Sequence, residues 1–307
     1  MGVIPPRSEQ RSKKMIKDFF HTGLQVSRTQ MEMLVNGLGP GNVWYVDYAD
    51  GNESNGGQSW RDAFKLLSQA HDAAVTDNHD TIIIKGVENV VEPAMVTIDK
   101  NYLTIVGIGG TLGHFGQSAA IGCALDAGAT NIATIKNTGT GNTFMGIRVL
   151  NENTVTEGIY AFADDGINST YINCGFLKVN DLDVTGAADF LCNAVTSQFY
   201  NCTFGSPAYI VADNMIRPKL MLTEIMSQAA SNIYVENCTF LCNTAGVEHV
   251  MVYGANATDV EGVLLLKNVV LLIILWLRQT LHMRLVLVLH KLKEQLSLKI
   301  VLPLIAP

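Results

Sequence analysis

The chain has few charged side chains, and most of them are acidic. Asp, Glu, Lys and Arg make up 16% of its 307 residues, against 48% for hydrophobic residues, so it can bury a substantial core. With a formal net charge of −7, it lacks the basic surface that nucleic-acid-binding proteins normally present. We therefore expect no nucleic-acid partner.

Long apolar segments and export signals are also missing. The first 25 residues include basic side chains but no apolar run long enough for a secretory signal peptide. An unbroken apolar run at residues 269–277 spans nine residues, which is too short to cross a bilayer as a helix. We expect no membrane partner. The sequence leaves the location open between a virion and the cell exterior, without a visible signal peptide.

The sequence does contain a repeated motif. Three stretches place Asn-Cys after apolar β-formers and a Phe two residues after the Cys: YINCGF (171–176), FYNCTF (199–204) and YVENCTF (234–240). Their Asn residues, at positions 173, 201 and 237, lie 28 and 36 residues apart. Such irregular spacing is typical of a structural coil that recurs with loops of varying length. Equivalent residues should then stack from coil to coil, with the Cys and Phe facing inward and the Asn passing hydrogen bonds along a bend.

The six cysteines fit this repeat better than they fit a metal site. Three of them hold the same motif position, where a small apolar thiol packs well in a core. No CxxC pair is matched by a second pair, as a zinc site would need. We therefore expect buried free thiols at Cys123, Cys174, Cys192, Cys202, Cys238 and Cys242.

A second pattern precedes the repeat. A strand-like stretch at residues 44–47 is followed by a turn-rich segment, DGNESNGG (50–57). Ser59 and Asp62 then have the spacing of a helix capping box, which predicts a helix over residues 60–75. Short β-branched runs follow at residues 81–84, 90–91, 96–98 and 103–107.

This succession resembles the opening of right-handed parallel β-helix proteins of the pectin-lyase-like superfamily, of the pectate lyase and phage β-helix type. The similar elements are the strand, the Asp-Gly-Asn turn, "SW..AF..L..A...A", "DTI.I" and "LTI.G". The resemblance implies an all-β, single-stranded right-handed parallel β-helix, a solenoid. It also implies that the helix over residues 60–75 closes the N-terminal end of the stack, whose apolar interior would otherwise meet water.

We expect three segments. Residues 1–41 form an N-terminal arm with helical apolar spacing, which either anchors the chain to a partner or is an ordinary capping helix. Residues 42–262 form the β-helix, with strand candidates at 130–136, 143–150, 159–162, 169–176 and 190–194. Residues 263–307 form a Leu-rich tail.

The tail differs sharply in composition from the rest of the chain. It has 16 Leu and no Gly or Asp, whereas residues 1–262 have 15 Leu and all 27 Gly. One interpretation is a Leu-rich helix pair or anchor. We favour a second hypothesis, a shifted reading frame, since AAT GTC GTT TTA TTA ATT ATT can encode residues 268–274. One T inserted after AAT gives Asn-Cys-Arg-Phe-Ile-Asn-Tyr, a fourth motif 31 residues after Asn237.

Candidate catalytic residues are few. A glycoside hydrolase needs two carboxylates, and Asp164-Asp165-Gly166 resembles the Asp-Asp motif of polygalacturonase-like hydrolases. The His-Gly and Arg-x-Lys companions of that motif are missing, and Asp-Asp-Gly is also an ordinary turn. Both interpretations of Asp164 and Asp165 stay open, with the turn favoured.

A polysaccharide lyase needs a cation for the uronate carboxylate and a base for the adjacent proton. Arg217 and Lys219 are candidates for these basic groups, and Asp213 is a candidate Ca²⁺ ligand. Their spacing does not match the family's arginine motif, so we favour a solvated loop. No cofactor is evident, and Ca²⁺ is expected only for a lyase.

Two functions follow from these observations. The first is a non-enzymatic structural or carbohydrate-binding β-helix, such as a component of a phage or virus-like particle, with polysaccharide or particle proteins as partners and a homo-oligomer as an open option. The second is a polysaccharide lyase or glycoside hydrolase of the superfamily. One scaffold can host both, so the fold does not choose between them.

Overall fold

The computed structural model describes residues 41–109, 119–123, 132–151, 159–178, 187–206, 210–211, 218–225, 228–244, 248–249, 251–254, 260–275 and 284–285. All of them belong to one compact unit, residues 38–307. The predicted arm lies outside the described residues except for position 41.

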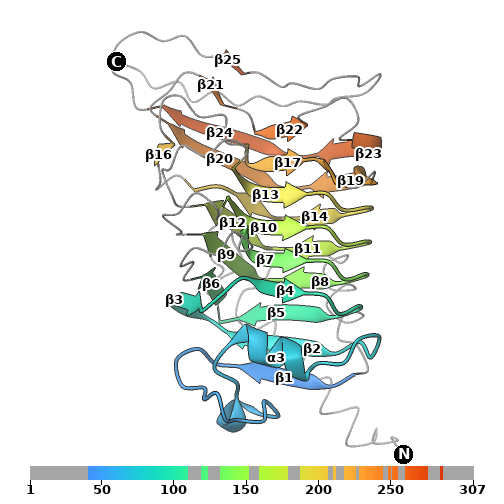
Figure 1. Ribbon diagram of the computed structural model, residues 1–307. Coiled ribbons are helices and arrows are strands. Elements are labelled where there is room, and N and C mark those ends of the chain that lie inside the picture. The colour runs from blue at the N-terminus through green and yellow to red at the C-terminus, as the bar shows by residue number, and fades with distance from the viewer. Residues whose placement is uncertain are drawn as a thin grey trace, which may run out of the picture. The chain divides into compact units, whose positions relative to one another are not determined.

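Most of the described strands belong to three parallel sheets, in which each coil of the chain adds one strand to each sheet (Figure 1). Sheet A consists of β1 (Val43–Val46), β2 (Thr81–Lys85), β5 (Thr104–Ile108), β8 (Thr143–Met145), β11 (Thr170–Ile172), β14 (Gln198–Tyr200), β19 (Gln228–Glu236) and β23 (Val260–Lys267), with β18 (Glu224–Ile225) antiparallel to β19. Sheet B consists of β3 (Val87–Glu92), β6 (Ala119–Cys123), β9 (Ile147–Asn151), β12 (Gly175–Lys178), β15 (Thr203–Phe204), β20 (Thr239–Thr244), β16 (Ile210–Val211) and β24 (Val270–Leu275). Sheet C consists of β4 (Val96–Ile98), β7 (Ala133–Asn137), β10 (Tyr160–Asp164), β13 (Ala188–Cys192), β17 (Leu220–Leu222) and β22 (Val252–Gly254).

The chain is a right-handed parallel β-helix, as the resemblance implied. Each middle coil runs from sheet C to sheet A, then to sheet B, and returns to sheet C, as β10, β11, β12 and β13 illustrate. Strands pair in register with the same sheet of the next coil, for example Phe162 with Phe190. The strand candidates predicted at 143–150 and 169–176 are each divided into two strands by a bend.

The Asn-Cys pair of the motif forms the bend between sheets A and B. Asn173, Asn201 and Asn237 have positive φ angles of 52°, 53° and 54°, which Asn tolerates better than most residues. Their backbone N–H groups donate to carbonyls of the following coil, as from Asn173 to Tyr200 at 2.8 Å. We predicted that the Asn side chains would form the hydrogen bonds along the bend. In the structure, the hydrogen bonds that join successive bends are donated by the backbone N–H groups of these Asn residues.

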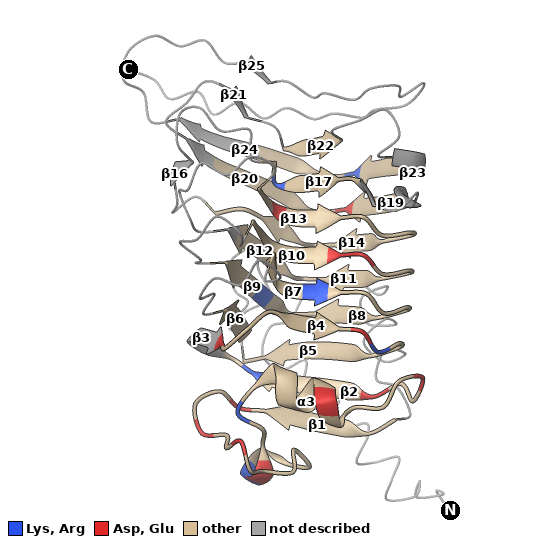
Figure 2. Ribbon diagram, in the orientation of Figure 1, with Lys and Arg blue, Asp and Glu red and all other residues tan. Residues whose placement is uncertain are grey.

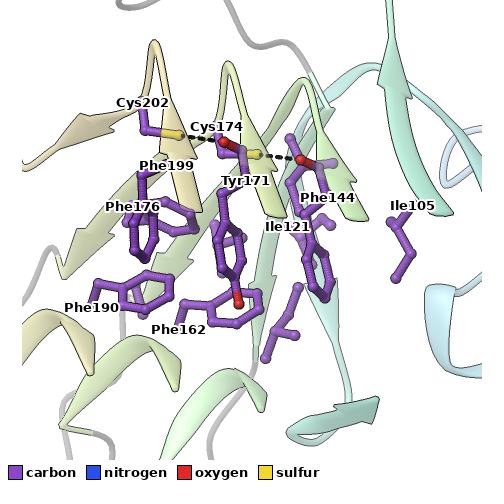
Figure 3. Packing of buried hydrophobic residues seen from close by; sticks show 14 of the residues in the cluster. Ile105, Ile121, Phe144, Phe162, Tyr171, Cys174, Phe176, Phe190, Phe199 and Cys202 are labelled. Carbon is purple, nitrogen blue, oxygen red and sulfur yellow. Dashed lines mark hydrogen bonds between the residues drawn. The ribbon is translucent and has the colours of Figure 1, made fainter. Parts of the chain in front are cut away.

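Aromatic side chains fill the interior between the three sheets (Figure 3). Phe144, Tyr171 and Phe199 stack in one column, with ring centroids 5.1 and 4.8 Å apart. Phe204 and Phe240 stack at 4.7 Å, which confirms the inward Phe column of the motif. The core is therefore continuous from coil to coil.

The six cysteines are buried free thiols, as predicted. Cys174, Cys202 and Cys238 have no exposed surface, and the backbone N–H of Cys202 donates to Cys238 Sγ at 3.3 Å. Burial raises the pKa of the Cys192 thiol well above its ordinary value, and the negative charge of Asp164 adds to this effect. These thiols are packing groups in the core.

The predicted helix over residues 60–75 is wrong in its extent. A short 3-10 turn, η1 (Trp60–Asp62), is followed by extended backbone and then by α3 (Leu67–Ala73). The side chain of Ser59 makes no capping hydrogen bond. The break arises because Phe64 joins the first coil: its N–H donates to the Tyr45 carbonyl at 2.9 Å and its carbonyl accepts from Asp47 N at 3.0 Å. Helix α3 contacts β1, β2 and β4 and buries Leu67 and Ala70, so it covers the N-terminal end of the core.

The coil stack continues through the boundary that we predicted at residue 262. Strand β23 pairs with β19, and β24 pairs with β20. Asn268 lies between them with a φ of 52°, which matches the Asn of the three motifs. Further on, β21 (Glu248–His249) pairs with β25 (Arg284–Leu285). No helix in the described part of the chain is long and apolar enough to cross a membrane.

Candidate functional site

The two adjacent carboxylates of the Asp-Asp turn lie in different environments. Asp164 ends β10 and is fully buried. Its carboxylate accepts hydrogen bonds from Asn137 Nδ2 and Ser197 Oγ, both at 2.8 Å, and from Gly166 N at 3.0 Å. Burial raises the pKa of Asp164, and these hydrogen bonds only partly oppose that rise. The bond to Gly166 is the local hydrogen bond expected of an Asp in a turn.

Asp165 instead lies close to Lys136 of the preceding coil. Lys136 Nζ is 2.8 Å from Asp165 Oδ2, and their side chains are 27% and 18% exposed. Asn193 Nδ2 of the following coil lies 3.4 Å from Asp165 Oδ1. Burial and the negative charge of Asp165 raise the pKa of Tyr160 to about 12. Three successive coils thus bring together the ammonium of Lys136, the carboxylate of Asp165 and the amide of Asn193. Figure 2 shows a basic position on β7 and an acidic one at the end of β10.

A hydrolase places two carboxyl groups on either side of one glycosidic bond. Asp164 has no exposed surface, whereas Asp165 is partly exposed and paired with a lysine. The arrangement therefore does not present Asp164 and Asp165 as an acid and base pair to a bound sugar. It is consistent with the turn that we favoured from the sequence.

Lys219 occupies an unexpected position. Its ammonium lies 2.8 Å from Asp189 Oδ2, and the two side chains are 3% and 0% exposed. The expectation of a solvated loop is therefore wrong for Lys219, since β17 begins at the next residue and carries the lysine into the protein interior. Breaking such a buried ion pair costs free energy, and the buried ammonium of Lys219 is not accessible to a uronate that binds at the surface. The other basic candidate, Arg217, and the candidate Ca²⁺ ligand Asp213 lie outside the described residues.

The longest connections of the middle coils join sheet B to sheet C. The bend from sheet A to sheet B between Ile172 and Gly175 takes two residues, whereas nine residues lie between β6 and β7. A second apolar cluster, separate from the main core, lies on sheet C: Ala133, Tyr160, Ala163, Ala188, Leu191 and Met221. Asp165 and Asn193 follow the C-terminal ends of β10 and β13, and Lys136 lies near the C-terminal end of β7, so this polar cluster lies at one edge of sheet C.

Sequence analysis missed Lys136 and Asn193. Lys136 pairs with Ala163 across β7 and β10, and Asn193 immediately follows β13. The sequence could have indicated these two residues only if successive coils had been aligned with one another.

Within the part of the chain that the structure describes, no group of three or more His, Cys, Asp or Glu side chains could hold a metal ion.

Comparisons with known proteins add information on the fold. No protein-family model matches the chain, and no curated protein matches it. Solved structures similar to it include the pectate lyase Pel9A (14% identity, TM-score 0.42, covering 68% of this chain and 49% of that one) and a rhamnogalacturonan lyase (13%, 0.46, 70% and 63%). Pectin methylesterase PemA from Erwinia chrysanthemi is another (13%, 0.37, 69% and 80%).

The chain spans about half the length of that pectate lyase. These structures are right-handed β-helix proteins, as is this chain. The parallel β-helix that we predicted from the sequence is confirmed by the three parallel sheets of the described strands.

Proposed function

We propose that the chain binds an acidic polysaccharide at sheet C, with Lys136 as the cation that contacts a uronate carboxylate. The observation that carries this proposal is the Lys136, Asp165 and Asn193 cluster, in which each polar group comes from a different coil and is held by its neighbours. Groups that are already oriented lose little conformational freedom on binding, which favours affinity.

The cluster retains hydrogen-bonding capacity for a sugar. Lys136 has three N–H donors, of which Asp165 Oδ2 engages one. Asp165 accepts from both neighbours and has further lone pairs for a sugar hydroxyl. The pair is partly exposed, so a uronate carboxylate can approach the ammonium without breaking a buried ion pair.

The test is calorimetric titration of the full chain with polygalacturonate and with a neutral galactan. We expect polygalacturonate to bind more tightly and to lose affinity in 0.5 M salt. Lys136→Met should weaken that binding about tenfold or more, because it removes a charge-assisted contact. Lys65→Met, which changes a lysine in the N-terminal region, is the control. Equal affinity of the Lys136→Met variant and the parent chain would contradict the proposal.

A second candidate is a polysaccharide lyase, in which Lys136 would neutralise the uronate and Asp165 would accept the adjacent proton. The 2.8 Å pair favours it, since a cation and a base lie together. Incubation with uronate and neutral glycans, with and without Ca²⁺, followed by assays for unsaturated products and reducing ends, tests it. Turnover that Lys136→Met or Asp165→Ala abolishes would establish an enzyme. Binding without turnover would favour the non-enzymatic function, which includes a particle component.

A further inference from the structure

Sheet A carries a group of aromatic and polar side chains at its C-terminal coils, which we call the tyrosine patch: Gln198, Tyr200, Tyr234, Glu236 and Lys267. Strand register places Gln198 beside Tyr234, and Tyr200 beside Glu236, which is itself beside Lys267. Phe199 and Val235, between the patch positions, are fully buried in the core. Because side chains alternate along a strand, the patch residues lie on the outer face of sheet A.

The two tyrosine rings are neighbours held at their hydroxyl ends. Their centroids are 5.6 Å apart and their planes are tilted by 49°. Tyr200 Oη donates to Gln198 Oε1 at 2.8 Å, and Tyr234 Oη donates to Glu236 Oε2 at 2.6 Å. Both residues are partly exposed, and the hydrogen bonds of their hydroxyl groups orient the rings before any ligand arrives.

Charge within the patch is balanced. Lys267 Nζ lies 2.7 Å from Glu236 Oε1, and the lysine side chain is 53% exposed. Hydrogen bonds from Lys267 and Tyr234 lower the pKa of Glu236, so this group is a carboxylate at neutral pH. The patch therefore offers ring faces flanked by one ammonium, one carboxylate and one amide, with no net charge.

We propose that the tyrosine patch binds an uncharged polysaccharide, with the two rings against the C–H faces of successive sugars and the flanking polar groups bonded to sugar hydroxyls. Tyrosine suits such a ligand because it combines an apolar body with a polar tip. Neighbouring coils are spaced about 4.8 Å apart, so the two rings follow one another along the stack as sugars follow one another in an extended chain.

A protein partner fits the patch less well. Stable protein interfaces bury roughly 1,000 Å² or more and are depleted of charged residues at their centre. Here the Glu236–Lys267 ion pair lies directly beside both rings. The inference is independent of the proposed function, since it concerns a different sheet and a ligand without carboxylates.

Affinity electrophoresis of the full chain in gels that contain neutral polysaccharides, such as xylan, arabinan, galactan and hydroxyethyl cellulose, tests this proposal. We expect at least one of these to retard the parent chain, with little change in 0.5 M salt because the ligand is uncharged. The double variant Tyr200→Ala/Tyr234→Ala should lose about tenfold or more in affinity. Tyr234→Phe should keep most of it, because the ring remains.

Tyr102→Ala, which removes a 41% exposed tyrosine elsewhere, is the control and should bind like the parent. Urea unfolding establishes that each variant is folded; if the double variant is not, the single Tyr234→Ala variant replaces it. The absence of retardation by every glycan, or equal retardation of parent and double variant, would overturn the proposal. So would self-association that the Tyr→Ala changes abolish in a chain that binds no glycan, because the patch would then contact a second copy.

Discussion

The two ends of the coil stack are built differently. At the N-terminal end, α3 covers the core with Leu67 and Ala70, and buried carboxylates join it to the first coils. At β23 and β24 the parallel register of β19 and β20 continues, and side chains alternate: Leu264 is 8% exposed, whereas its neighbours Val263 and Leu265 are 57% and 43% exposed. Strand register thus continues the solenoid into β23 and β24, and side chains that cross from α3 to the first coils close its N-terminal end.

Polar contacts at the N-terminal end illustrate this difference. Glu92 accepts from Leu67 N at 2.7 Å, from Ser68 Oγ at 2.8 Å and from Tyr48 Oη at 2.8 Å. Lys100 Nζ donates to backbone carbonyls at the end of α3, including that of Asp72 at 2.9 Å. Both ends of α3 are thus held by side chains of the coils beneath it.

The largest effect should come from the apolar contact of the cap. Leu67→Ala removes a side chain with no exposed surface and should lower the free energy of unfolding by about 2–5 kcal/mol. Urea unfolding followed by circular dichroism measures the change. Val75→Ala, at a 51% exposed position of the same end, should change stability by less than about 0.5 kcal/mol. Similar values for both variants would show that α3 does not close the core.

A smaller effect should come from Asp80, which accepts from Trp44 Nε1 at 3.1 Å and Val75 N at 2.9 Å. Burial alone would raise the pKa of Asp80, but the hydrogen bonds from Trp44, Val75, Asn42 and Asn78 lower it below its ordinary value. Because the folded-state pKa is depressed, this stabilisation is present above the unfolded-state pKa and is lost as pH falls through the folded value.

Asp80→Asn should therefore cost about 2 kcal/mol at pH 7 and progressively less below about pH 4. Unfolding midpoints from pH 7 to pH 2.5 measure this dependence. Glu53→Gln, at an exposed position nearby, is the control and should follow the parent. A pH-independent difference between Asp80→Asn and the parent would contradict the electrostatic explanation.

The smallest effect concerns the last coil and the reading-frame hypothesis. Leu271 takes the place beside Phe240 that Phe holds in the three motifs. Leu271→Phe should extend the Phe204–Phe240 stack and raise stability by about 0.5–1 kcal/mol. Val270→Phe, at the 48% exposed neighbour, should give no gain. A loss of stability in Leu271→Phe would count against a fourth motif; sequencing the source DNA tests the hypothesis directly.

Much of the fold could be predicted because the repeat constrains the same position in every coil. The inward Cys and Phe columns follow from the spacing of the motif alone. The candidate site was less predictable, since Lys136, Asp165 and Asn193 share no sequence motif and meet only because three coils stack. The prediction of one helix over residues 60–75 was wrong for a related reason. The local sequence pattern favoured a helix, but the backbone hydrogen bonds between Phe64 and the first coil hold that residue in an extended conformation.

The sequence by itself determined the architecture: parallel coils, buried thiols and a bend at each Asn-Cys pair. Only the tertiary structure decided which polar groups face inward. It buries Asp164, pairs Lys219 with Asp189 in the interior, and leaves Asp165 partly exposed beside Lys136. The physical reason is that a buried carboxylate or ammonium is stable only beside a hydrogen-bonding or oppositely charged partner. Such partners come from other coils: Asn137 and Ser197, which donate hydrogen bonds to Asp164, lie 27 and 33 residues away in the sequence.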